Sequence, residues 1–140
     1  HIFPLTRMNK KLYIPLPVLG SLYPLWRGVI FKSAEDLPSK PYQTLVHSVL
    51  EARGDHPNVV FVAGHDHGLQ FITNEDLVQV VSGSGSKSSF ILDNKQLKFK
   101  YQQQGFCVAD YLSNGAIRVS YYIFKGADTV KAYETTILKK

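Results

Sequence analysis

The segment Asn58-Val59-Val60-Phe61-Val62-Ala63, followed at once by Gly64-His65-Asp66-His67-Gly68, decides how the fold of this sequence is interpreted. The first part is a short, continuous apolar run with β-branched content, which is typical of a strand buried on both faces. Loops that leave the end of such a strand are where α/β proteins place many of their functional side chains. We therefore expect a buried strand that positions a functional loop.

The histidine pair of this loop is a candidate metal site. On a locally extended backbone, His65 and His67 would leave the same face with their Cα atoms about 6.6 Å apart. Two such side chains can reach two neighbouring ions, because the metals of two-metal hydrolytic sites lie roughly 3.5–4 Å apart. Imidazole binds zinc, iron, manganese and nickel, so the spacing does not name the metal. We expect Asp66, between them, to be exposed to solvent, and the alternative is that it orients one of the imidazoles.

The residues before and after the motif predict one helix followed by strands. Leu45, Val46, Val49 and Leu50 recur at helical spacing after Pro41, which predicts a helix over 41–53. Asn114-Gly115 predicts a hairpin with a two-residue primed turn, which needs positive φ at both positions. The expected strands after the motif are 70–73, 77–82, 89–92, 98–102, 106–112, 116–124 and 130–137.

Composition bounds the class of protein. The chain has 140 residues, of which 44% are hydrophobic, enough for one domain or part of one. The net charge of +5 comes from scattered lysines and arginines, so we infer no nucleic-acid partner. Cys107 is the single cysteine, which excludes an intrachain disulfide and a cysteine-based zinc cluster.

Residues 1–40 are rich in proline, and we expect an irregular loop there. Three prolines within 12–30 argue against a membrane-spanning helix in this segment. Because the chain starts with His1 and carries no signal-peptide pattern, we expect it to be cut from a longer protein. Gly83-Ser84-Gly85-Ser86-Lys87 invites comparison with a phosphate-binding loop, but a hairpin turn is the favoured interpretation because the Walker spacing is absent.

The segment 59–70 resembles the last metal-binding motif, Gly-His-x-His, of the calcineurin-like metallophosphoesterase family. The segment 80–86 is similar to the strand and Gly-rich turn that come next in purple-acid-phosphatase-like members. The helix over 41–53 matches the helix that precedes the motif in that family. The resemblance covers about residues 41–124, and the opening loop is similar to that of large bacterial envelope members.

This resemblance implies an α+β fold, mostly β after one helix, that forms the C-terminal part of a four-layer α/β/β/α metallophosphoesterase sandwich. The chain 1–140 would be the C-terminal portion of a calcineurin-like phosphoesterase domain, with a loop at 1–40 and the helix, core strand and β-rich part at 41–140. His65 would bind the second of two ions and His67 the first, with manganese, iron or zinc as the metals. A hydroxide between the ions would attack a phosphate ester.

The family's other ligand motifs, among them an Asp-x-His and an Asn-His, do not occur in residues 1–64. The resemblance therefore implies a bacterial metal-dependent phosphoric ester hydrolase in a longer parent chain, with this piece inactive by itself. Its partners would be a phosphate-ester substrate and the missing N-terminal half of the same domain. Its location would be the bacterial cell envelope or periplasm.

A second hypothesis from a different class stays open. The chain would then be a non-catalytic β-rich binding or packing module, in which His65 and His67 are incidental. A domain cut through its sandwich would also expose apolar surface and sheet edges, which favours self-association of the fragment.

Overall fold

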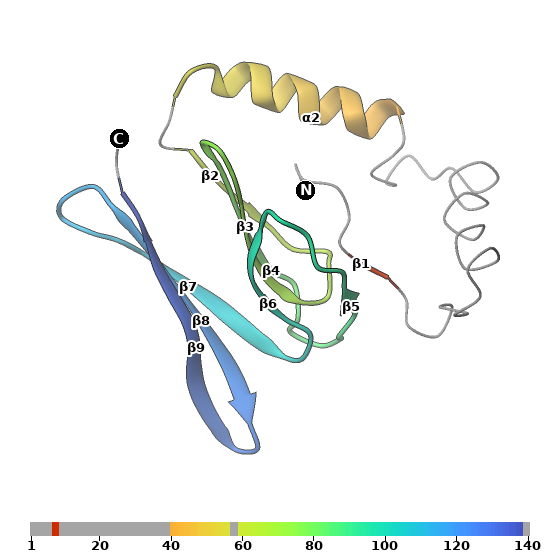
Figure 1. Ribbon diagram of the computed structural model, residues 1–140, viewed down its shortest axis with the longest axis vertical. Helices are drawn as coiled ribbons and strands as arrows, with labels where there is room; N and C mark the ends of the chain where they lie inside the picture. Colours follow the sequence, from red (N-terminus) through yellow and green to blue (C-terminus); the bar gives the residue numbers. More distant parts are fainter. Residues whose placement is uncertain (1–6, 9–39, 57–58, 139–140) are drawn as a thin grey trace.

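The computed structural model describes residues 7–8, 40–56 and 59–138. In this part the chain forms one helix and nine strands (Figure 1). The helix is α2 (Lys40–Arg53), and the strands are β1 (Arg7–Met8), β2 (Val60–Ala63), β3 (Leu69–Asn74), β4 (Leu77–Ser82), β5 (Phe90–Ile91), β6 (Leu97–Tyr101), β7 (Gly105–Tyr111), β8 (Ile117–Lys125) and β9 (Asp128–Ile137).

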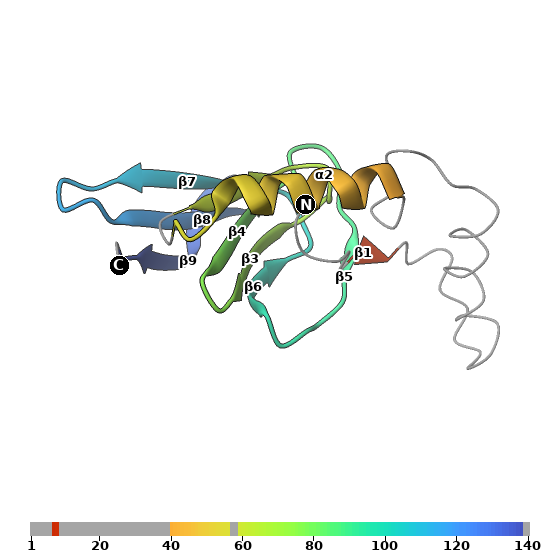
Figure 2. The same cartoon turned by 90° about the horizontal axis from the view of Figure 1, so that it is seen from above.

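The strands form a four-stranded sheet in the order β2-β4-β3-β6, a three-stranded sheet in the order β7-β8-β9, and a short pair, β1-β5. Within the described strands, β2 runs parallel to β4 and all other pairs are antiparallel. The two larger sheets face each other, and α2 runs along the four-stranded sheet on the side of β2 (Figures 1 and 2). The element content agrees with an α+β protein that is mostly β after one helix.

The main core lies between the two larger sheets. Alternate residues of each strand point inward, so that Leu69, Phe71 and Val80 of one sheet meet residues of β8 from the other. Tyr121 is the largest of these, and it is fully buried. Its hydroxyl donates a hydrogen bond of 2.5 Å to the backbone carbonyl of Gln70, which joins the two sheets directly.

Aromatic rings pack around Tyr121. The ring of Phe99 in β6 lies 4.9 Å from that of Tyr121 and 4.8 Å from that of Tyr133 in β9, where the two planes differ by 11°. Such offset ring pairs add to the free energy gained from burial alone. The edge strands β6 and β9 are thereby held by the same central contact as the middle strands.

The hairpin predicted at Asn114-Gly115 is present between β7 and β8, but its turn differs from the prediction. Gly115 has a φ of 82°, whereas Asn114 does not have positive φ. The Gly115 amide donates to the Leu112 carbonyl at 2.9 Å, and the Asn114 side chain accepts from the Ala116 amide at 3.1 Å. The chain therefore makes an ordinary turn closed by a left-handed glycine, because the Asn114 side chain binds the backbone.

The helix and each predicted strand end within two residues of the expected positions. One expectation about burial differs, because the first strand was expected to be buried on both faces. That expectation is wrong: Val62 is 73% exposed. The reason is that β2 is the last strand of its sheet, with no described strand beyond it. No described helix is long and apolar enough to cross a membrane. The loop predicted for 1–40 falls almost entirely outside the described residues.

The contact between the sheets can be tested at Tyr121. Tyr121→Phe removes the hydroxyl but keeps the ring, so it should lower the free energy of unfolding by about 1 kcal/mol, the usual contribution of one buried hydrogen bond. Tyr133→Phe is the matched control with a change near zero, because its hydroxyl makes no hydrogen bond within the described part. Chemical denaturation of the three proteins measures both values, and equal stability of wild type and Tyr121→Phe would contradict the role of this bond.

Candidate functional site

The loop that carries the two histidines is tightly turned, not extended as expected. The Asp66 amide donates to the Gly64 carbonyl at 2.8 Å, and the Gly68 amide donates to the Asp66 carbonyl at 2.8 Å. Each bond closes a three-residue γ-turn, the first around His65 and the second around His67. His65 accordingly has a φ of 68°, which is rare for a residue other than glycine. The two histidines therefore do not follow the extended geometry on which the metal prediction was based.

Asp66 is buried, with 2% of its surface exposed, so its expected exposure to solvent is wrong. The pKa of the Tyr42 hydroxyl is raised, first by the partial burial of Tyr42 and second by the negative charge of Asp66. Asp66 therefore lies on the side of the N-terminal part of α2. His65, by contrast, is exposed, and His67 is half-buried. The turned backbone thus directs the aspartate inward.

The Gly-rich segment after β4 packs against this loop. The Gly83 amide donates to the Gly68 carbonyl at 3.1 Å, and the Ser89 amide donates to the His67 carbonyl at 2.7 Å. A Cβ atom on Gly83 would collide with the Asp66 backbone carbonyl. The segment leads to β5, which pairs with β1 and not with β4, so the predicted hairpin turn is wrong. Its glycine allows two loops to lie in direct backbone contact.

The described part of the chain gives no group of further ligands for a metal at the histidines. Among the described residues, no group of three or more histidine, cysteine, aspartate or glutamate side chains is placed to hold an ion. The predicted metal role of His65 and His67, and the predicted pair of ions, therefore stay predictions.

Cys107 is a free cysteine on the inner face of β7, and a thiol can in principle act as a nucleophile. Burial raises the pKa of its thiol to about 11, so the thiol is protonated at neutral pH. A protonated thiol is a poor nucleophile. Cys107 therefore has no sign of an activated catalytic cysteine and packs beside the core.

A second candidate, not predicted from the sequence, lies on the outer face of the three-stranded sheet. Phe106, Tyr122 and Phe124 lie there side by side, and we call them the aromatic patch. The ring of Phe106 is 5.2 Å from that of Tyr122 and 6.1 Å from that of Phe124. Phe106 is 40% exposed and Phe124 is 46% exposed. The sequence contains a hint of this patch, because residues 121–124 are all aromatic or aliphatic. A strand turns alternate side chains to opposite faces, so two of these four side chains must point away from the main core.

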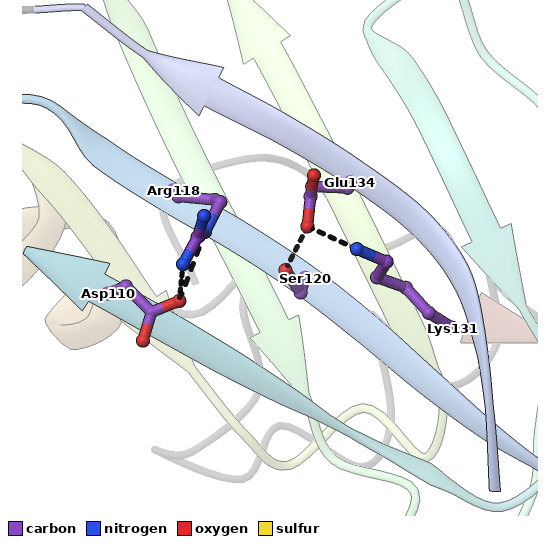
Figure 3. A network of polar contacts seen from close by, with 5 residues as sticks. All are labelled: Asp110, Arg118, Ser120, Lys131 and Glu134. Carbon is purple, nitrogen blue, oxygen red and sulfur yellow. Dashed lines mark hydrogen bonds and ion pairs between the residues drawn. The ribbon is translucent and has the colours of Figure 1, made fainter. Parts of the chain in front are cut away.

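A charged cluster continues the same outer face (Figure 3). Arg118 donates to Asp110 through Nε at 3.2 Å and Nη2 at 3.1 Å. Lys131 and Ser120 donate to one oxygen of Glu134 at 2.7 Å and 2.9 Å. The bonds from Lys131 and Ser120 lower the pKa of Glu134, and the bond to Glu134 raises the pKa of Lys131. The charges of the cluster are thus largely paired within the chain.

Comparison with known proteins finds a similar sequence and a similar solved structure. No protein-family model matches the chain. The chain is 31% identical over 84 residues to glideosome-associated protein 50 of Plasmodium falciparum, isolate 3D7, and this match covers 58% of the chain and 21% of that protein. A solved structure described as GAP50, the anchor in the inner membrane complex of Plasmodium, matches 70% of the chain and 31% of its own, with 25% identity and a TM-score of 0.59. The chain thus spans less than a third of either protein.

These matches correct the functional predictions. One protein is named for association with the glideosome and the other as an anchor, and neither name is that of a hydrolase. The resemblance to calcineurin-like metallophosphoesterases, the phosphoric ester hydrolase function and the phosphate-ester substrate are therefore wrong as predictions for this chain. The same holds for the missing N-terminal half of a phosphoesterase domain. In the structure, the loop of His65 and His67 lacks the extended backbone from which that function was inferred.

The matches also replace two finer predictions. The solved structure that shares this fold is that of an anchor protein, so the finer prediction of a metallophosphoesterase sandwich loses its support. That anchor is described as part of the inner membrane complex of Plasmodium, which disagrees with a bacterial envelope or periplasm.

The contact between the two loops predicts that alanine at Gly83 and alanine at Gly85 change the stability of the chain very differently. Gly83→Ala should destabilise the chain by about 2–3 kcal/mol, because its Cβ atom would overlap the Asp66 carbonyl and force the backbone apart. Gly85→Ala is the matched control with a change near zero, since a Cβ atom there meets nothing within 4 Å. Thermal and denaturant unfolding measure both, and a stable Gly83→Ala variant would show that the loops are not in contact.

The charged cluster predicts a pH-dependent stability. Because the pKa of Glu134 is lowered on folding, its contribution is present above its ordinary value of 4.5 and is lost as the pH falls through the folded-state value. The melting temperature of wild type should therefore exceed that of Glu134→Gln at neutral pH, and the difference should vanish in acid. Glu75→Gln, in an exposed turn, is the control without this trend. A difference that stays constant with pH would exclude the ion pair as its source.

Proposed function

We propose that the chain is a non-catalytic β-rich binding module that attaches a partner protein to a membrane-associated assembly. The observation that carries this proposal is the aromatic patch on the outer face of the three-stranded sheet. It also draws on the names of the matched proteins, which describe a glideosome-associated protein and an anchor in an inner membrane complex. The chain covers only part of those proteins, so their roles are part of the proposal.

The aromatic patch is not required by the fold. The inner face of β8 supplies Val119, Tyr121 and Ile123 to the core, which is filled without the outer rings. Exposed aromatic residues that cluster on one face mark interaction sites more often than isolated ones do. Tyrosine and phenylalanine are also enriched at the centres of protein interfaces.

The rings of the patch are already packed against one another before any partner arrives. Phe106 and Tyr122 are opposite each other on β7 and β8, and their ring planes differ by 15°. Side chains held in this way lose little conformational entropy on binding. The patch is therefore suited to act as a rigid anchor for a partner surface.

The charged cluster is suited to form the polar rim of this interface. Asp110 and Glu134 are satisfied by Arg118, Ser120 and Lys131, so a partner need not neutralise them. Exposed ion pairs of this kind contribute little to affinity, but they orient a partner. A protein with an apolar centre and a polar margin fits this face better than a highly charged ligand.

The patch can be tested by identifying the partner and then measuring its affinity. A photo-reactive benzoylphenylalanine replaces Phe124, and a second protein carries the same group in place of Leu92, which is similarly exposed and follows β5, outside the three-stranded sheet. In cells of the source organism, one defined protein should cross-link at position 124 and not at position 92.

The purified cross-linked protein is then titrated calorimetrically. Phe106→Ser with Phe124→Ser should weaken its binding at least about tenfold, as expected when interface hot spots are lost. Leu92→Ser is the control with unchanged affinity, and both variants should keep the melting temperature of wild type. Equal affinity for the double variant, or binding of the patch to protein-free vesicles of anionic lipid in place of a protein, would overturn the proposal.

A further inference from the structure

We propose that residues 84–94 form a strap that closes over residues 64–68, and that the ammonium group of Lys100 holds the strap closed. We call residues 64–68 the histidine loop. The strap is a conformational device inside the chain, so this inference goes beyond the proposed function and does not involve the aromatic patch. It rests on the contacts that join the strap to the histidine loop and on the position of Lys100 in β6.

The strap has little regular structure of its own. It contains no helix, and its only strand is the two-residue β5. The four residues 85–88, which precede β5, lie outside any helix or strand and are not buried. A segment with little burial and few backbone hydrogen bonds opens locally at a lower cost in free energy than the sheets do. The position of the strap is therefore set by its contacts with neighbouring parts of the chain.

Two contacts seat the strap on the histidine loop. The Ser89 amide donates a hydrogen bond of 2.7 Å to the His67 carbonyl. The Ile91 side chain, which is 1% exposed, lies so close to Gly68 that a Cβ atom on this glycine would collide with it. The missing side chain of Gly68 thus allows the strap to lie directly on the loop. Together with the bond from the Gly83 amide to the Gly68 carbonyl, these contacts support the turned backbone of the loop.

Lys100 contacts the strap from β6. Its Nζ donates to the Ile91 carbonyl at 3.2 Å and lies 2.7 Å from Oδ1 of Asp93. The side-chain amide of Gln102, just after β6, donates to the same carbonyl at 3.4 Å. Ile91 packs on the histidine loop through its side chain, and Lys100 holds it at its backbone. The contact with Lys100 therefore acts directly on the residue that seats the strap.

The bond from Lys100 to the carbonyl contributes more than its ion pair does. The side chain of Asp93 is 85% exposed, and exposed ion pairs add little to stability. The side chain of Lys100 is 27% exposed, and its bond to the Ile91 carbonyl is partly buried. A hydrogen bond from a charged donor is stronger than one between neutral groups. Gln102 is neutral and its bond is longer, so Lys100 is the stronger of the two donors to this carbonyl.

The strap joins segments that are far apart in the sequence. Its strand β5 pairs with β1, with Arg7 opposite Ile91 (Figure 1). Ile91 is thereby in contact with β1, with the histidine loop and with β6. The main core consists of other residues, so the strap can open while the two larger sheets stay packed. Opening would uncover the histidine loop and loosen β1 at the same time.

Amide hydrogen exchange, followed by NMR in the isotope-labelled 140-residue chain, tests the role of Lys100. Lys100→Met keeps an apolar stem and removes the ammonium group. The Ser89 amide should then exchange at least about threefold faster, because the strap opens more often. Lys100→Arg keeps the charge and the donors, so its Ser89 amide should exchange at close to the wild-type rate. The amides of 119–123 in the core strand β8 should exchange equally in all three proteins.

Lys98→Met is the matched control. Lys98 lies on the same strand and also donates to a backbone carbonyl, that of Lys95 at 3.3 Å, but Lys95 lies outside the strap. Its replacement removes one positive charge from β6, as Lys100→Met does. The Ser89 amide of this variant should exchange at the wild-type rate.

A second measurement shows whether the histidine loop is uncovered. Diethyl pyrocarbonate acylates accessible imidazoles, and mass spectrometry resolves the modified residues. His67 is half-buried, so it should react faster in Lys100→Met than in wild type, by about the factor found for Ser89, because both report the same opening. His65 is already exposed and serves as the internal reference, with the same rate in both proteins.

Several outcomes would overturn the inference. An unchanged Ser89 rate in Lys100→Met, or an equal acceleration in Lys98→Met, would show that this lysine does not hold the strap. Equal acceleration at 119–123 would reveal a global loss of stability in place of a local opening. A Lys100→Arg variant as fast as Lys100→Met would rule out the charge as the cause. Unchanged reactivity of His67 would show that the strap does not cover the loop.

Discussion

The packing of the two larger sheets against each other is the feature that determines the rest of the structure. Tyr121 lies at its centre, buried against Phe99 and bonded through its hydroxyl to the backbone of Gln70. Because the inner face of β8 is committed to this contact, the opposite residues of the same strand must face outward. The outward position of Tyr122 and Phe124 is thus a consequence of the core, and the binding surface that we propose is the other side of the same strand.

The same arrangement explains why the described part of the chain has two unlike surfaces. The three-stranded sheet covers the inner face of the four-stranded sheet but does not extend over Val62, which is largely exposed. One surface is then a flat face with rings and paired charges, and the other is the end of the four-stranded sheet at β2. The face with rings suits attachment to another protein, which is the role that we propose for it.

Local patterns in the sequence predicted the elements well, because apolar periodicity and turn residues act over short distances. The helix at 41–53 and the strand 77–82 lie almost where they were expected. The loop at 64–68 could not be predicted, because its shape depends on Gly83, a residue that meets it only through the folded sheet. The positive φ of His65 could not be predicted for the same reason. The function was misjudged because a short motif carried the family resemblance, whereas the matched proteins are named for association with the glideosome and for anchoring.

One set of aromatic rings is enclosed between the sheets, while another stays on the outside and is free to meet a partner. Hydroxyl-radical footprinting with mass spectrometry tests this division in a single experiment on the native chain. We expect rapid oxidation of Phe106 and Phe124 and strong protection of Tyr121, with equal rates for all three after unfolding. Protection of Phe106 and Phe124 in the native chain, or rapid oxidation of Tyr121, would show that the division does not exist.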